Sequence, residues 1–146
     1  MRQAAEGRRK IFASILLRAE AATYLLAARS ALAVFSFHRL TRFFNRPLVR
    51  PELTGTARER ARKEVQRAIF HARRNWSMET TCLHQAVAAQ AMLWRRGVGS
   101  TLYYGAATLP GRGLCGHAWV QDGNAGVVGL LVAQRDGYQV LARFPE

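Results

Sequence analysis

Cysteine, lysine and acidic residues are all scarce in this chain of 146 residues. Two cysteines are too few for a disulfide scaffold, so a hydrophobic core has to hold the domain together. Only Lys10 and Lys63 among the 22 basic residues are lysines, which makes the positive charge almost entirely arginine. With nine acidic residues against them, the formal net charge is +13. The apolar fraction of 49% is ordinary for one globular domain of this length.

Long apolar runs, internal repeats and low-complexity tracts are also lacking. The run 11–17 is only seven residues long before Arg18, and the run 21–37 is interrupted by Arg29. A helix that spans a bilayer needs about 20 consecutive apolar residues. We therefore expect a cytoplasmic protein that is not integral to a membrane.

The positive charge is concentrated in the first half of the chain. Residues 1–75 hold 17 basic and 5 acidic residues, whereas residues 76–146 hold 5 and 4. A region of this kind can bind nucleic acid, an anionic membrane surface, or an acidic peptide or protein. The same arginines can equally form solvated helix faces, and both interpretations stay open. Aromatic residues do not alternate with the basic ones as a nucleic-acid stacking platform requires, so nucleic acid is not an expected partner.

Hydrophobic periodicity predicts helices first and strands afterwards. The expected helical segments are 9–37 (one long helix or two), 57–74 and 82–96, with an aromatic-basic piece at 38–44 and a proline-marked connection after it. The expected strands are about 101–106, 116–121, 126–132 and 138–143. This order predicts an α+β fold. A basic helical region over 1–55 precedes a core over 56–146, in which one helix packs on a small antiparallel sheet.

The most informative residues are one cysteine and one histidine. Cys82 begins the third helical segment, where Thr80 or Thr81 can cap the helix and the positive end of the macrodipole favours a thiolate. His117 lies 35 residues later on an expected strand and can act as general base and acid. Together they predict a cysteine enzyme of the papain or transglutaminase kind.

Several local motifs resemble one family. They are Cys82-Leu83 opening an alanine-rich helix, the segment 93–98 closing it, Gly116-His117-Ala118-Trp119-Val120, and the ending 138–144. Over about 60–144, and most specifically over 81–121, the chain resembles the transglutaminase-like leader peptidases of lasso-peptide biosynthesis. These are related to the C-terminal half of microcin-processing proteins.

The resemblance implies a cytoplasmic cysteine protease that removes the leader from a ribosomally made precursor. Its implied partners are the leader of that precursor, a small leader-recognition protein and an ATP-dependent, asparagine-synthetase-like cyclase. Cofactors belong to the cyclase, so none is expected for this chain. Cys82 matches the family nucleophile and His117 the family base.

The third member of the catalytic set is less defined. Many relatives have an aspartate about twelve residues after the histidine, where this chain has Gly129. Asp122 is a candidate, but strand alternation points it away from His117 unless the chain turns at Asp122-Gly123. The other candidates to orient His117 are a backbone carbonyl, a water, or an amide such as Gln121.

The same residues allow other interpretations. Cys82-x-His84 with Cys115-x-His117 invites a zinc site, but residues two apart on a helix diverge and structural zinc pairs have wider spacing, so no metal is expected. Trp76 is a candidate wall of the cleft and Trp119 a candidate shield of the imidazole from water, and both can equally be ordinary core residues. The rival functions are a catalytically idle scaffold of the same biosynthetic complex, and a basic module that binds nucleic acid or a membrane surface.

Overall fold

The computed structural model describes residues 2–46, 50–75 and 80–145. The helices are α1 (Arg2–Val34), α2 (Phe37–Phe44), α3 (Gly55–Asn75), α4 (Cys82–Arg95) and the short α5 (Leu130–Arg135). The strands are β1 (Thr101–Leu109), β2 (Gly113–Asp122), β3 (Ala125–Val128) and β4 (Gln139–Phe144). They form one antiparallel sheet in the order β3-β2-β1-β4. The predicted α+β class, with the cysteine helix packed on a small antiparallel sheet, is confirmed.

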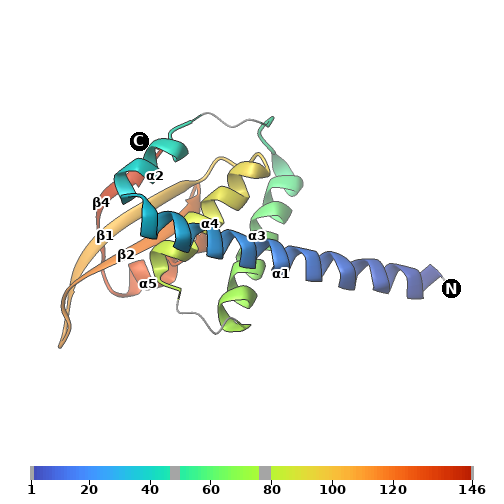
Figure 1. Cartoon of the computed structure of the whole chain (residues 1–146), viewed down its shortest axis with the longest axis horizontal. Helices are drawn as coiled ribbons and strands as arrows, with labels where there is room; N and C mark the ends of the chain where they lie inside the picture. Colours follow the sequence, from blue (N-terminus) through green and yellow to red (C-terminus); the bar gives the residue numbers. More distant parts are fainter. Residues whose placement is uncertain (1, 47–49, 76–79, 146) are drawn as a thin grey trace.

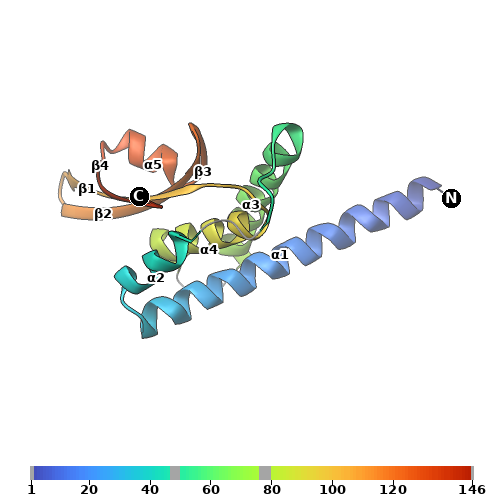
Figure 2. The same cartoon turned by 90° about the horizontal axis from the view of Figure 1, so that it is seen from above.

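The helix α4 occupies the middle of the molecule. It packs against β2 on one side and against α1 and α3 on the other, so it separates the sheet from the long α1 helix (Figures 1 and 2). Its alanines make this possible, because Ala86 and Ala89 have no exposed surface and allow close approach of the neighbouring backbones. The start of α4, with Cys82, is thereby held next to the sheet.

Two helices cover α4 with small and aliphatic side chains. From α3 the buried residues recur at helical spacing: Ala61, Val65, Ala68, Ile69 and Ala72. From α1 the buried residues are Ala21, Leu25 and Ala28, and Glu20 of α1 bonds Arg96 beyond the end of α4 at 2.6 Å. The second half of α1 is therefore part of the core.

One local expectation was wrong. The segment 126–132 is not one strand, because Gly129 has a left-handed φ of +77° and α5 begins directly after it. Leucine and alanine after the glycine favour a helical turn. The aromatic-basic piece, for which the sequence predicts no particular element, is the helix α2. In the first half of α1, Ile11, Ile15 and Leu16 are exposed, because they lie on the side of the helix that faces away from α3.

The continuity of α1 bears on the expected absence of a membrane-spanning length. Because the two apolar runs join in one helix, the segment Glu6–Val34 is long and apolar enough to cross a membrane by length and composition. Arg18, Glu20 and Arg29 lie within that segment. Only a minority of that segment is buried, against α3 and α4.

Candidate active site

The first turn of α4 fixes the position of Cys82. Thr81 is the N-cap, and its hydroxyl oxygen accepts the backbone N–H of His84 at 3.4 Å. In return, the backbone N–H of Thr81 donates to Nδ1 of His84 at 3.0 Å, which completes a reciprocal capping box. His84 is half-buried and holds the helix start. Gln85 adds a hydrogen bond from Nε2 to the carbonyl of Thr80 at 3.2 Å.

The edge of β2 presents the second residue. β3 pairs with β2 only from Val120 to Asp122, so the backbone of β2 before Val120 is not paired with β3. Cys82 lies at this stretch, where the Ala118 backbone N–H donates a hydrogen bond to its sulfur and the His117 side chain is bonded to the same thiol. The structure thus brings Cys82 and His117 together across 35 residues of sequence, as the two motifs predicted.

The electrostatics of this pair favour a thiolate and an imidazolium. Burial raises the pKa of the Cys82 thiol, but the hydrogen bond with His117 and the N–H groups of Ala118 and Leu83 outweigh it, so the pKa is lowered overall. The pKa of His117 is raised, chiefly by its hydrogen bond with Cys82, against the opposing effect of burial. The Gly129 carbonyl and the negative charge of Asp136 add to that rise. Each group therefore stabilises the charged form of the other.

A backbone carbonyl holds the far side of the imidazole. Nε2 of His117 lies 2.9 Å from the carbonyl oxygen of Gly129 and donates to it, which leaves Nδ1 for Cys82. A side chain at position 129 has no room, because a Cβ there would lie 3.0 Å from Nε2 of His117 and 2.9 Å from the Ala118 carbonyl oxygen. Position 129 thus contributes a backbone carbonyl oxygen to the imidazole and no side chain.

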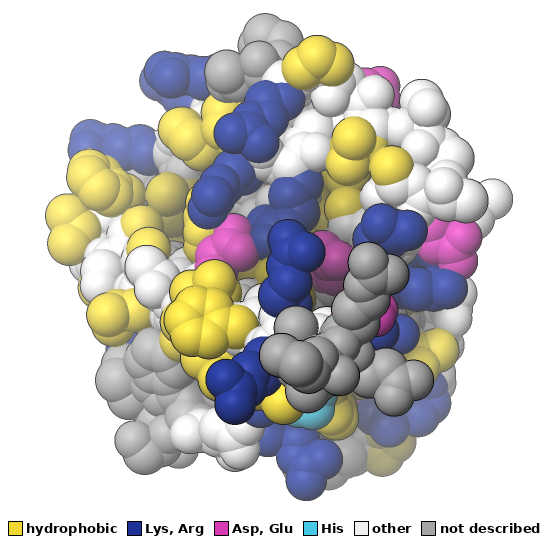
Figure 3. All heavy atoms as spheres, turned by 90° about the vertical axis from the view of Figure 1, so that its right-hand side faces the viewer, with side chains coloured by type: hydrophobic (Ala, Val, Ile, Leu, Met, Phe, Trp, Pro, Cys, Tyr) yellow, Lys and Arg dark blue, Asp and Glu magenta, His cyan; other side chains and the backbone are white. Residues whose placement is uncertain are grey.

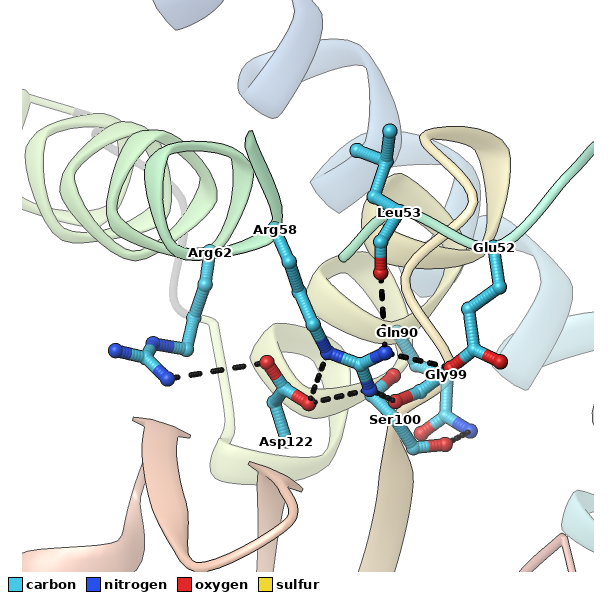
Figure 4. A network of polar contacts seen from close by, with 8 residues as sticks. All are labelled: Glu52, Leu53, Arg58, Arg62, Gln90, Gly99, Ser100 and Asp122. Atoms are coloured by element: carbon cyan, nitrogen blue, oxygen red, sulfur yellow. Dashed lines mark hydrogen bonds and ion pairs between the residues drawn. The ribbon is translucent and has the colours of Figure 1, made fainter. Parts of the chain in front are cut away.

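Asp122 lies in a different network. Its Oδ1 accepts hydrogen bonds from Nε and Nη2 of Arg58 at 2.9 and 2.6 Å, and its Oδ2 lies 3.8 Å from Arg62 (Figure 4). Arg58 also donates to the carbonyls of Leu53 and Gly99. This network joins α3 to the end of β2 and to the chain before β1. The structure brings Asp122 to α3 and not to His117, as strand alternation indicates.

Aromatic rings enclose the imidazole. The Trp119 ring is nearly parallel to the His117 ring with centroids 6.0 Å apart, and it stacks on Tyr103 at 5.6 Å. Tyr138 approaches His117 from another direction, at 5.1 Å. Trp119 therefore serves both interpretations made for it, since it is buried and also covers the imidazole. Trp76 lies outside the described residues.

Several of these contacts have little or no signal in the sequence. Tyr138 and Asp136 come from the segment between α5 and β4, which no motif connects to the histidine. Gln85 has a weak signal, because it lies one helical turn after Cys82.

Beside Gln85, a cavity of about 430 Å³ is lined by residues of α3, β3 and α5, among them Phe70, Arg73 and Gly129.

Neither cysteine is part of a disulfide. Both Cys82 and Cys115 are free and half-buried. Among the described residues, no group of three or more His, Cys, Asp or Glu side chains is arranged to hold a metal ion. Cys82 therefore stands as a thiol paired with an imidazole.

Comparison with known proteins identifies the domain type. A family model described as the transglutaminase-like superfamily matches residues 22–143, which include the second half of α1 and all the elements that build the site. No curated protein and no solved structure gives a significant match. A cysteine at a helix start beside a strand histidine, within such a domain, supports chemistry of the cysteine-peptidase type.

Proposed function

This chain belongs to the transglutaminase-like superfamily, and on that premise we propose that it is a cysteine peptidase that removes the leader from a ribosomally made lasso-peptide precursor. The observation that carries the peptidase is the Cys82–His117 pair, whose mutual hydrogen bond favours the reactive ionic form. The leader-removing role rests on the motif resemblance over 81–121 and on the basic surface of the first 75 residues.

In the proposed reaction, the Cys82 thiolate attacks the carbonyl carbon at the leader–core junction and a C–S bond forms. The N–H of Cys82, at the first position of α4, has no acceptor within the helix and is available for the developing oxyanion. His117 gives its proton to the departing amine as the C–N bond breaks. It then takes a proton from water, which attacks the acyl-enzyme and releases the leader carboxylate and the thiolate.

The neutral carbonyl of Gly129 has a defined part in this cycle. By accepting the Nε2–H it holds the tautomer in which Nδ1 faces the thiol, and it keeps the ring from rotating. It supplies no full negative charge, so the imidazolium is balanced mainly by the thiolate itself. The Gly129 carbonyl thus orients the imidazole but does not neutralise its positive charge.

Partners and location belong to the proposal as well. The small domain leaves limited surface for reading a peptide sequence, so a leader-recognition protein presents the precursor, and removal of the leader frees the α-amine that an ATP-dependent cyclase needs. The excess of 12 positive charges in residues 1–75 suits contact with an acidic leader or partner. The reaction is placed in the cytoplasm, where such a precursor is made.

Leader release by the purified protein tests the proposal. The protein is mixed with the precursor and its recognition protein, and the products are read by mass spectrometry. We expect release by wild type and by Cys115→Ser, and none by Cys82→Ala. Release by Cys82→Ala would refute the nucleophile. A wild-type protein that binds the partners without releasing leader would favour the idle scaffold.

A further inference from the structure

The outer face of the first half of α1 is apolar, although no described element of the fold covers it. The side chains of Ile11, Phe12, Ile15 and Leu16 are 63%, 67%, 56% and 59% exposed. Their spacing places them on one side of the helix, opposite the stripe that begins at Leu17 and buries Ala21, Leu25 and Ala28 against the core. The helix therefore has two apolar faces, of which the fold uses one.

The charge around this outer face has a single sign. No acidic residue occurs between Glu6 and Glu20, whereas Arg8, Arg9, Lys10 and Arg18 all lie in that stretch. The two acidic residues at its borders are engaged, Glu6 with Lys10 at 3.1 Å and Glu20 with Arg96 at 2.6 Å. Figure 3, which faces the end from which α1 projects, shows many Lys and Arg side chains next to hydrophobic ones, with some acidic side chains among them.

We propose that this face of α1 (Ile11, Phe12, Ile15 and Leu16 with the flanking Arg8, Arg9 and Arg18) docks the protein on an anionic lipid surface. An apolar stripe bordered by arginines is the composition of helices that lie in the membrane interface, with aliphatic and aromatic side chains in the acyl boundary and guanidinium groups at the headgroups. The surface is the outermost layer of the molecule. The sheet that carries His117 lies beyond α4, on the opposite side (Figure 2).

The contacts of α1 favour lying on the membrane over crossing it. The hydropathic segment Glu6–Val34 contains Glu20, which bonds Arg95 and Arg96 at 3.1 and 2.6 Å, and Leu25, which is buried in the core. A membrane-spanning α1 would lose these contacts and carry Arg18, Glu20 and Arg29 into the hydrocarbon, which is costly. An interfacial α1 keeps all of them.

A second copy of the chain is the less suitable occupant. In a symmetric pair the same arginines would face each other, on proteins that each carry a formal charge of +13. An anionic bilayer instead neutralises them. Docking is independent of leader removal, so Cys82→Ala should bind lipid as wild type does.

Co-sedimentation of the full-length protein with vesicles tests this. Wild type should bind vesicles of phosphatidylcholine with phosphatidylglycerol at least about tenfold more tightly than phosphatidylcholine alone, with an affinity that falls as salt increases. Phe12→Gln/Leu16→Gln should lose about tenfold or more, because two exposed apolar side chains no longer insert. Arg8→Gln/Arg9→Gln should lose about tenfold and depend less on salt. The matched control is Val140→Thr/Leu141→Thr on β4, where the side chains are 53% and 66% exposed, and it should bind as wild type does.

The following results would contradict the docking of this face on a lipid surface. Wild type that does not bind anionic vesicles, or a Phe12→Gln/Leu16→Gln variant that binds equally well, would refute the docking surface, provided that circular dichroism shows the fold intact. If light scattering showed a wild-type dimer that this variant converts to monomers, a second copy would be the occupant instead. Protein that resists alkaline extraction from cell membranes would indicate a spanning helix and overturn the interfacial one.

Discussion

Opposing effects act on the thiol of Cys82. Burial favours the neutral thiol, whereas the imidazole of His117 and the N–H groups of Ala118 and Leu83 favour the thiolate. The three hydrogen-bond donors outweigh burial because they converge on one sulfur, and two of them belong to the rigid backbone. A helix start and a strand edge thus provide an activated nucleophile, and His117 is the one charged side chain that acts on the thiol among the residues the structure describes.

The pH dependence of Cys82 alkylation should report this balance. With Cys115→Ser as background, the rate of reaction with iodoacetamide should reach half its maximum at a pH below that of an ordinary thiol, because the pKa of Cys82 is lowered. His117→Ala removes the largest stabiliser and leaves burial, so the midpoint should move upward. A midpoint that His117→Ala does not move would show that the imidazole does not contact the thiolate.

The rate of leader release should have two pH limits. Activity needs Cys82 deprotonated and His117 protonated, so kcat/KM should rise through the lowered pKa of the thiol and fall through the raised pKa of the imidazole. Asp136→Asn removes a charge that raises the pKa of His117 and should move the alkaline limb to lower pH. An alkaline limb unchanged in that variant would show that Asp136 has no effect on the imidazole.

Gly129 should tolerate no side chain. In Gly129→Ala, a left-handed residue with a Cβ costs about 1–2 kcal/mol, and the methyl group lies where Nε2 of His117 and the Ala118 carbonyl are too close. We expect a large loss of kcat/KM in addition to the loss of stability. The control is Gly111→Ala, with a φ of +72° and open space around it, which should show the strain alone. Equal activities of the two variants would contradict the orienting role of the Gly129 backbone.

What the sequence could predict at this scale follows from how local each signal is. Cys82 and His117 each have a recognisable neighbourhood, so their pairing could be inferred. The Gly129 carbonyl could be expected only as one of several orienters, because a backbone oxygen has no residue type. Tyr138 could not be predicted, since its contact with His117 depends on where α5 directs the following chain.

At the scale of elements, the Arg58–Asp122 network joins α3 to the sheet. Asp122 is buried and accepts two hydrogen bonds from Arg58, which itself reaches the carbonyl of Gly99 (Figure 4). A buried carboxylate needs such partners, because removing them leaves an unpaired charge in the protein interior. The network therefore fixes where β2 ends relative to α3, and with it the edge that presents His117.

Asp122→Asn should consequently affect stability more than catalysis. Replacing the carboxylate weakens two short charge-assisted hydrogen bonds, at a cost of roughly 1–3 kcal/mol in the free energy of unfolding measured with urea. Leader release by the folded fraction should stay close to wild type. A loss of activity of about a hundredfold in a folded protein would instead make Asp122 the orienter of His117.

The elements were predictable where a pattern repeats and not where it changes. α3 and α4 follow from apolar residues at helical spacing, and β1 and β2 from short runs between glycine-rich turns. The sequence predicts one strand over 126–132, because Val127 and Val128 favour a strand. The structure has β3 followed by α5, and only Gly129 marks the change from strand to helix. The left-handed φ of Gly129, which ends the strand, is a property of the folded chain.

Over the whole molecule, the two halves of α1 lie in different environments. Its second half belongs to the core, whereas its first half projects into solvent (Figures 1 and 2). Leu25 and Leu26 are the sharpest comparison, since they are neighbours with 1% and 46% exposure. Leu25→Ala should lower the free energy of unfolding by about 2–5 kcal/mol, as for other buried leucines. Leu26→Ala should change it little, and equal losses would mean that α1 is packed differently.

Truncation extends this comparison to the division between residues 1–55 and 56–146, which stays a prediction. Removing residues 1–16 should leave the urea midpoint almost unchanged, because the side chains that pack on α3 and α4 begin at Leu17. Removing residues 1–34 takes away Glu20 and Leu25 and uncovers apolar surface of α3 and α4, so the remainder should be unfolded or aggregate. If that shorter protein folds and releases leader, the region before residue 56 is a separate appendage. If it unfolds while the first truncation keeps its activity, α1 is divided near Leu17 into a free arm and a structural helix, and the catalytic domain begins well before residue 56.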